Sequence, residues 1–151
     1  MPTYTVTTAN LTLTPAQESA IAAAITDAHQ SNTGAPGFLA QVMFVALPQR
    51  KHYIGGKLNE IPHVFVHGLI RAGRSADAKA GLIAEIASKA GRVAGIGAED
   101  IWVYLQEIAP EQMVEFGRVL PAPGAESRWL EGLSPAKRRQ LAAAGVTVNA
   151  R

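Results

Sequence analysis

The sequence predicts an α/β (α+β) fold, in which two β-α-β units form one four-stranded sheet with two helices on a single face. The first observation behind this prediction is a repeated spacing of strand start, helix cap and next strand. Intervals of 12 positions separate Pro2 from Thr14 and His63 from Ser75, and intervals of 25 separate Thr14 from Leu39 and Ser75 from Asp100. The second observation is composition: 48% hydrophobic and 17% charged residues are enough to build a buried core.

The first unit begins with Thr3 to Thr8, whose Thr, Tyr and Val residues are typical of a strand. Thr14 then offers an N-cap, Pro15 suits the first helical position, and Gln17 completes a capping box. The apolar stripe of this helix is Ile21, Ile25 and Ala28. Gly34 supplies a stop, so we expect the helix to end near Thr33 and Gly34.

A continuous apolar run from Leu39 to Leu47 predicts a buried strand that closes the first unit. The second unit repeats the order, with a strand over His63 to Ile70 and a helix capped by Ser75. The apolar face of this helix is Leu82, Ile83, Ile86, Ala90 and Val93. Ile101 to Glu107 is the fourth strand, and within each unit the two strands should be parallel.

We expect residues 1–151 to form a single domain, with repeats at about 2–47 and 63–107 and a C-terminal packing segment at about 108–151. In that segment Trp129 and Leu130 resemble packing residues, and Ser134 with Pro135 starts another helix. One face of the sheet would remain apolar and uncovered, and a partner subunit is the natural cover.

The chain has no cysteine, which excludes disulfides and thiolate metal sites and favours a reducing cytoplasm. No apolar run predicts a membrane span, and the N-terminus lacks the features of a signal peptide. A net charge of +2 does not indicate a nucleic-acid surface, and the basic run at 137–139 fits a solvated helix face. His52, His63 and His67 lack the spacing of a zinc motif, so we expect no metal. The glycine-rich fingerprints of nucleotide sites are also absent, and we expect no cofactor.

Candidate chemistry begins with Pro2, because removal of Met1 would give a secondary amine that can exchange protons near neutral pH. Arg71 and Arg74 precede the Ser75 cap, where the helix dipole disfavours cations, so an anion is expected to offset them. The residues alone leave alternatives open: many chains carry a second-position proline, and the arginines would also fit a solvated loop.

Three further side chains are candidates. His29 falls on the inward stripe of the first helix, Tyr104 lies in the fourth strand, and Glu115 is a carboxylate among apolar residues that could have a raised pKa and act as a base. A satisfied core histidine, ordinary strand packing of the tyrosine, and an exposed or Arg118-paired glutamate are the corresponding alternatives.

Jointly, these residues and their surroundings resemble the cis-3-chloroacrylic acid dehalogenase family of the tautomerase superfamily. The matching segments, in order, are Met1-Pro2, Ala24–His29, Phe38–Val42, Phe65–Leu69, Arg71–Asp77, Ile101–Tyr104, Gln112–Arg118, Leu120–Gly124 and Trp129. The resemblance covers nearly the whole chain. It implies the duplicated β-α-β fold and a homotrimer.

By resemblance, Pro2 is the catalytic amine, His29, Arg71 and Arg74 bind a small carboxylate substrate, and Tyr104 and Glu115 activate water. The implied reaction is cofactor-independent hydrolytic dehalogenation of a 3-haloacrylate to malonate semialdehyde, with Pro2 as the acid. Two alternatives stay open: keto–enol tautomerisation of a 2-oxo acid such as phenylpyruvate with Pro2 as the base, and a non-enzymatic trimeric binding module.

Overall fold

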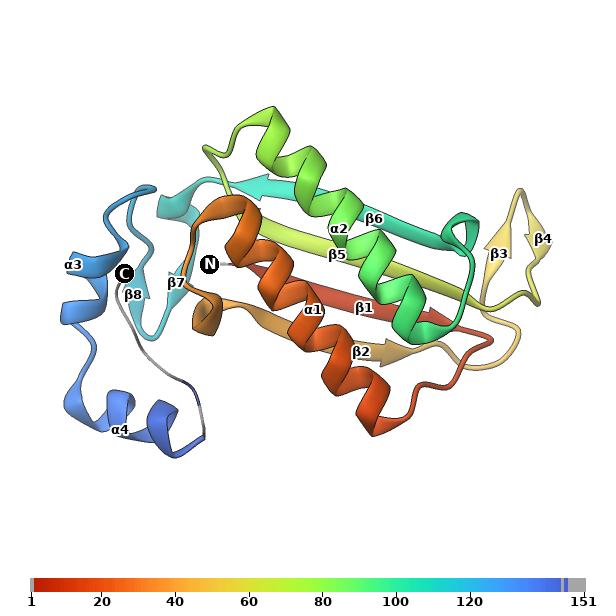
Figure 1. The fold of residues 1–151 in the computed structure, drawn as a ribbon, viewed down its shortest axis with the longest axis horizontal. Coiled ribbons are helices and arrows are strands. Elements are labelled where there is room, and N and C mark those ends of the chain that lie inside the picture. Colours follow the sequence, from red (N-terminus) through yellow and green to blue (C-terminus); the bar gives the residue numbers. More distant parts are fainter. Residues whose placement is uncertain (1, 145, 147–151) are drawn as a thin grey trace.

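The computed structural model describes residues 2–144 and 146, so Met1 and the predicted tail positions 145 and 147–151 lie outside it. Its centre is a four-stranded sheet in the order β2-β1-β5-β6, covered on one face by α1 and α2 (Figure 1). The predicted fold class is confirmed.

The first unit consists of β1 (Thr3–Ala9), α1 (Pro15–Thr33) and β2 (Gln41–Ala46), with β1 and β2 parallel. The predicted capping box is present: the Thr14 hydroxyl accepts from the Gln17 backbone N–H at 3.2 Å, and the Gln17 side chain accepts from the Thr14 N–H at 2.9 Å. Gly34 ends α1 with φ of 69°, a left-handed conformation that glycine adopts without strain.

The predicted strand at Leu39 to Leu47 is corrected in two respects. Gly37–Leu39 forms a short 3₁₀ helix, η1, before β2 begins at Gln41. β2 is also an edge strand whose residues are half or fully exposed, because Met43 and Val45 point to the uncovered face of the sheet. A continuous apolar run does not distinguish a strand buried within one chain from a strand with one uncovered face.

The second unit consists of β5 (His63–Arg71), α2 (Ala76–Ala94) and β6 (Ile101–Ile108), with β5 and β6 parallel. Ser75 caps α2 by accepting from the Ala78 N–H at 3.1 Å. The two units join through β1 and β5, which are antiparallel and pair Val6 with Val66. The carboxyl end of β5 therefore lies beside the amino end of β1.

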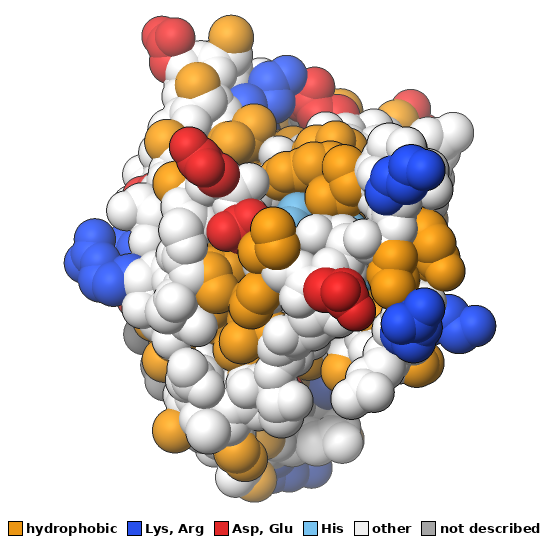
Figure 2. Space-filling model, turned by 90° about the vertical axis from the view of Figure 1, so that its right-hand side faces the viewer, with side chains coloured by type: hydrophobic (Ala, Val, Ile, Leu, Met, Phe, Trp, Pro, Cys, Tyr) orange, Lys and Arg blue, Asp and Glu red, His pale blue; other side chains and the backbone are white. Residues whose placement is uncertain are grey.

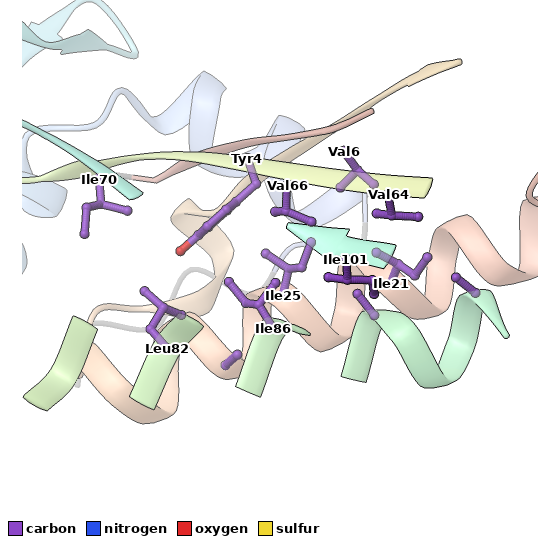
Figure 3. Close-up of a cluster of buried hydrophobic side chains, with 13 residues drawn as sticks. Tyr4, Val6, Ile21, Ile25, Val64, Val66, Ile70, Leu82, Ile86 and Ile101 are labelled. Carbon is purple, nitrogen blue, oxygen red and sulfur yellow. The ribbon is translucent and has the colours of Figure 1, made fainter. Parts of the chain in front are cut away.

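The main core lies between the sheet and the two helices (Figure 3). Its fully buried members include Tyr4, Val6, Ile21, Ile25, Val64, Val66, Ile70, Leu82 and Ile86. Tyr4 points from β1 toward the helix layer and carries the cluster's hydroxyl group. This core fixes both helices on the sheet and so fixes the residues at their ends.

Short elements lie at the two ends of the sheet (Figure 1). At one end is the hairpin of β3 (Tyr53–Ile54) and β4 (Lys57–Leu58). At the other end are η3 (Pro110–Gln112), the hairpin of β7 (Val114–Glu115) and β8 (Arg118–Val119), and the helices α3 (Glu126–Glu131) and α4 (Pro135–Ala143). Between α2 and β6 lies η2 (Ala98–Asp100).

Packing residues were expected in the C-terminal segment, and the structure has them. Trp129 and Leu130 are buried in a second, smaller cluster with Leu39, Leu120 and Leu133. Ser134 caps α4 through the Lys137 N–H at 3.2 Å. This cluster joins α3 to η1, next to the amino end of β1.

The face of the sheet away from the helices carries exposed apolar side chains, as expected from the sequence. These are Met43 and Val45 of β2 and Trp102 and Tyr104 of β6, each more than 40% exposed. Among the described residues, no helix is long and apolar enough to cross a membrane.

Candidate active site

Pro2 lies at the end of the sheet where β5 finishes. It directly precedes β1, its side chain is fully buried, and its carbonyl accepts from the Gln41 N–H at 2.9 Å. The antiparallel register pairs Thr3 with Leu69. Extending that register by one position brings Pro2 level with Ile70, immediately before Arg71.

Arg71 is the last residue of β5, and its side chain is only 4% exposed. Its Nη1 donates to the Pro121 carbonyl at 2.7 Å, and its Nη2 forms an ion pair with Glu126. The Nε of Arg71 is buried and has no hydrogen-bond partner among the described residues. A buried donor without an acceptor is destabilising, so this atom is suited to binding a ligand oxygen.

Arg74 lies three residues later, at the start of α2. Its Nη1 donates to the Thr33 carbonyl at the end of α1, at 2.7 Å, and its Nη2 lies 4.0 Å from Glu126 Oε1. Between the two arginines, Gly73 has φ of 102°, which a side chain would strain. The chain therefore turns sharply enough to bring both guanidinium groups to one carboxylate.

The electrostatics of this cluster follow from partial burial of like charges. Burial, followed by the positive charge of Arg71, lowers the pKa of Arg74, while Glu126 opposes that shift. Burial is the largest single influence on the pKa of Glu126 and would raise it, but the hydrogen bond from Arg71, backbone hydrogen bonds and the positive charge of Arg71 together hold that pKa below its ordinary value. Glu126 is therefore an ionised counter-charge.

His29 is buried near the end of α1, where its Nδ1 lies 2.8 Å from the Tyr4 hydroxyl. Burial, and then the charges of Arg74 and Arg71, lower the pKa of His29 to about 3, so the ring is neutral at pH 7. Burial raises the pKa of Tyr4, which keeps its proton. If Tyr4 donates that proton to Nδ1, Nε2 carries the ring's own proton and can donate to an anion.

Glu115 ends β7, just before a tight turn in which Phe116 and Gly117 have φ of 52° and 75°. It helps to line a hollow of about 480 Å³, together with Thr3, the residue after Pro2. Phe38, Gln41 and Met113 line the same hollow. The structure thus places Glu115 and the amino end of β1 around one space.

Tyr104 is not part of this group within the chain. It is paired with His67 of β5, which is paired with Thr5 of β1. Tyr104 is therefore level with Thr5, three residues along β1 from Pro2, and β6 is two strands away from β1. These two separations place its backbone about 14 Å from that of Pro2. Its side chain is 56% exposed on the open face, in edge contact with Phe65 at 5.1 Å between ring centroids.

Comparison with known proteins identifies the family. A family model described as "Putative oxalocrotonate tautomerase enzyme" (Tautomerase_3) matches residues 1–132. The crystal structure of N1, a member of the cis-3-chloroacrylic acid dehalogenase (cis-CaaD) family, is 32% identical to this chain. The alignment covers 93% of this chain and 99% of N1, with a TM-score of 0.85. The chain belongs to the cis-CaaD family of the tautomerase superfamily.

Other tautomerase-like structures agree on the fold. Native Ps01740 is 26% identical over 75% of this chain and 99% of its own, with a TM-score of 0.70. A fused 4-OT described as a symmetric trimer is 23% identical over 75% of this chain and 90% of its own, with a TM-score of 0.69. A search of curated proteins returned no match to the chain.

Within this cis-CaaD family member, the structure groups four of the predicted residues at one end of the sheet: Pro2, His29, Arg71 and Arg74. Glu115 lines the adjoining hollow, and Tyr104 lies apart. Sequence reasoning did not identify Tyr4 or Glu126. The one signal for Glu126 was indirect, since two arginines at a helix start require an anion without indicating which residue supplies it. The described residues hold no group of three or more His, Cys, Asp or Glu arranged for a metal.

Proposed function

We propose that this protein adds water to a cis-3-haloacrylate and releases halide and malonate semialdehyde. The observation that carries the proposal is the pair of a buried Arg71 and a partly buried Arg74 at the amino end of β1, with the Arg71 Nε lacking a partner among the described residues. Such an arrangement suits a small organic anion held next to the Pro2 nitrogen. The similarity to N1 over nearly the whole chain supports the same reaction class.

Substrate binding would use charge-assisted hydrogen bonds from Arg74, from the Arg71 Nε and from neutral His29. Withdrawal of electron density toward the bound carboxylate makes C3 of an α,β-unsaturated acid electrophilic. The fixed positions of these groups at the ends of α1, β5 and α2 would hold the substrate in one orientation. This step requires no cofactor.

Water would be activated by Glu115, which lines the hollow next to Thr3. Tyr104 would assist from a neighbouring copy, because its own chain holds it about 14 Å from Pro2 along the sheet. A homotrimer would cover the apolar face that carries Tyr104 and bring that residue to an adjacent site. The trimer described for the fused 4-OT structure is compatible with this arrangement.

The chemistry then balances without further reactants. Glu115 takes a proton from water as the oxygen bonds to C3, and the Pro2 ammonium gives its proton to C2. The resulting 3-halo-3-hydroxypropanoate loses halide and a proton to give malonate semialdehyde. Pro2 acts as the acid, which requires removal of Met1 and a protonated nitrogen.

Keto–enol tautomerisation of a 2-oxo acid is the second candidate, favoured by the description of the matching family as oxalocrotonate tautomerases. Here an unprotonated Pro2 would act as base and return the proton to the neighbouring carbon. The same arginines would bind the carboxylate. The two candidates therefore differ in the protonation state of Pro2 and in their need for Glu115.

The test is a side-by-side assay on protein whose intact mass shows that Met1 is absent. We expect halide release from cis-3-chloroacrylate, little release from the trans isomer, and slower ketonisation of phenylenolpyruvate. Glu115→Gln should remove the halide release, while Glu111→Gln, an exposed neighbour on η3, should not. Faster ketonisation than dehalogenation would favour the second candidate, and retention of Met1 in native material would favour a non-enzymatic binding module.

A further inference from the structure

Glu126 places a carboxylate of the protein itself against both arginines. It forms an ion pair with Arg71, and its Oε1 lies 4.0 Å from Arg74 Nη2. The three side chains are 4%, 14% and 16% exposed for Arg71, Arg74 and Glu126. The contact is therefore shielded from water, where an ion pair has more influence than on an open surface.

The segment that carries Glu126 is packed rather than loosely attached. Trp129 and Leu130, three and four residues further along, are buried in the second cluster. The Trp129 Nε1 donates to the Val119 carbonyl at 2.8 Å, and the Arg118 guanidinium donates to the Trp129 carbonyl. Glu126 is thus held at the arginines by the folding of α3 and is a built-in part of the cluster.

The charges of the site leave one positive charge for a ligand. Arg71 and Arg74 contribute two positive charges, Glu126 contributes one negative charge, and His29 is neutral at pH 7. The Pro2 ammonium and the Glu115 carboxylate of the proposed function carry opposite charges and leave this sum unchanged. Each terminal nitrogen of Arg71 already donates to a protein acceptor, and its Nε is a buried donor without a partner among the described residues, suited to a ligand oxygen. One carboxylate would neutralise this cluster, whereas two would leave a net negative charge beside buried groups.

We propose that Glu126 is a specificity-determining residue that restricts the site to monocarboxylates by neutralising one of the two arginines. The inference rests on the proposed function, because it takes Arg71 and Arg74 to be the carboxylate site. It adds the substrate class: an unsaturated acid with one carboxylate, whose C3 substituent is uncharged. An acid with a second carboxylate at C3 would be rejected by charge rather than by size.

Binding of two acids of similar shape tests this directly by titration calorimetry, without turnover as the readout. The probes are cis-crotonate and maleate, which differ at C3 by a methyl group or a carboxylate, at a pH where all carboxyls are ionised. Wild-type protein should bind cis-crotonate more tightly. In Glu126→Gln the affinity for maleate relative to that for cis-crotonate should rise by about tenfold or more.

Two variants control for folding and for unrelated charge. Glu126→Asp keeps the negative charge and should keep the preference for cis-crotonate. Glu131→Gln removes an exposed carboxylate from the same helix and should leave the ratio unchanged. Circular dichroism of each variant should match wild type. If Glu126→Gln unfolds, loss of the preference in Glu126→Asp would itself overturn the proposal, since that variant retains the charge.

The remaining outcomes separate this inference from the proposed function. If Glu126→Gln binds both acids more tightly by the same factor, Glu126 is only an internal competitor for the arginines. If it binds both more weakly by the same factor, Glu126 only positions Arg71. Either result overturns the inference and leaves the carboxylate site intact. Failure of both acids to bind wild-type protein would overturn the site itself and the inference with it.

Discussion

The two β-α-β units share their construction, and they differ at the ends where ligands would bind. Both helices have 19 residues, begin at a hydroxyl cap (Thr14 or Ser75) and end at a left-handed glycine (Gly34 or Gly95). A proline also precedes the first strand of each unit: Pro2 before β1 and Pro62 before β5. The repeated spacing had aligned Pro2 with His63, whereas the Val6–Val66 pair at the centre of the sheet makes Pro62 its counterpart.

The antiparallel pairing of β1 and β5 places these two prolines at opposite ends of the sheet, and the residues around them have diverged. His29 is the fifteenth residue of α1, and the fifteenth residue of α2 is Ala90. Arg74 immediately precedes the cap of α2, and Leu13 immediately precedes the cap of α1. The Pro62 nitrogen is bonded to Ile61 within the chain, so it cannot be an amine.

The end of the sheet at Pro62, beside the β3–β4 hairpin, has the same scaffold without the N-terminal proline and the arginines. A hollow of about 240 Å³ lies there, lined mainly by aromatic and aliphatic side chains, with the rings of His52 and His63 tilted toward each other at 4.6 Å between centroids. Figure 2 shows this end, where hydrophobic side chains gather around a histidine. The duplicated fold therefore offers two similar ends, and a chain terminus with two arginines makes one of them suitable for a carboxylate.

The largest expected effect on activity concerns the two equivalent prolines. Pro2→Ala replaces the proposed secondary amine by a primary one and should reduce kcat/KM by about 10² to 10⁴-fold, the usual contribution of a general acid or base. Pro62→Ala, at the equivalent and exposed position, should leave kcat/KM close to wild type. Steady-state kinetics on N-terminally verified protein measure both. Equal losses in the two variants would mean that Pro2 acts only through the structure of β1.

The next effect concerns the arginines. Arg74→Ala should weaken binding of a monocarboxylate by about 1.5 to 3 kcal/mol, which is about 10- to 150-fold in the dissociation constant, because a charged hydrogen bond is lost. Arg92→Ala, in the last turn of the same helix and at the other end of the molecule, is the matched control. Calorimetric titration with cis-crotonate checks the pair. A similar loss in Arg92→Ala would indicate long-range charge attraction instead of a local site.

Much of the fold was predictable because its determinants are local. Thr14, Pro15 and Gln17 form the predicted capping box, and Ile21, Ile25 and Ala28 are buried as their helical spacing requires. The exposure of β2 was not predictable from its apolar run, because burial of an edge strand depends on what covers the open face. Local patterns define elements, whereas the environment of a face depends on the assembly.

The candidate site was only partly predictable for a similar reason. Pro2, Arg71 and Arg74 lie at element ends, where the sheet register brings them together, and their residue types indicate acid/base and anion chemistry. Glu126 is 55 residues from Arg71 along the chain, and no local pattern links the two. Tyr104 carries no sequence signal that it points to the open face at a distance from Pro2, and its predicted role in water activation stays a prediction.

The third effect is a pH dependence that should differ between the two ends. The pKa of His29 falls from 6.5 to about 3 on folding, so below pH 6.5 the unfolded chain binds a proton that the folded chain does not. The free energy of unfolding should therefore fall as the pH drops from 6.5 toward 3, by up to about 1.4 kcal/mol per pH unit from this group. Urea unfolding at pH 7 and pH 5 measures the change.

His29→Gln should flatten that dependence more than His63→Gln at the other end. Burial, followed by the charge of His52, lowers the pKa of His63 as well, but Asp100 opposes that shift, whereas both arginines reinforce the shift of His29. An unchanged slope in His29→Gln would contradict burial of a neutral ring at this position.

The smallest expected effect concerns the hydroxyl caps of the two helices. Thr14→Ala and Ser75→Ala each remove a hydroxyl that accepts a backbone N–H, and each should lower the free energy of unfolding by about 1 kcal/mol. Their effects on activity should differ, because Ser75 adjoins Arg74 while Thr14 adjoins Leu13. Ser75→Ala should raise KM for the haloacrylate a few-fold, and Thr14→Ala should not. If both variants raise KM equally, general loosening of the fold, rather than placement of Arg74, controls substrate binding.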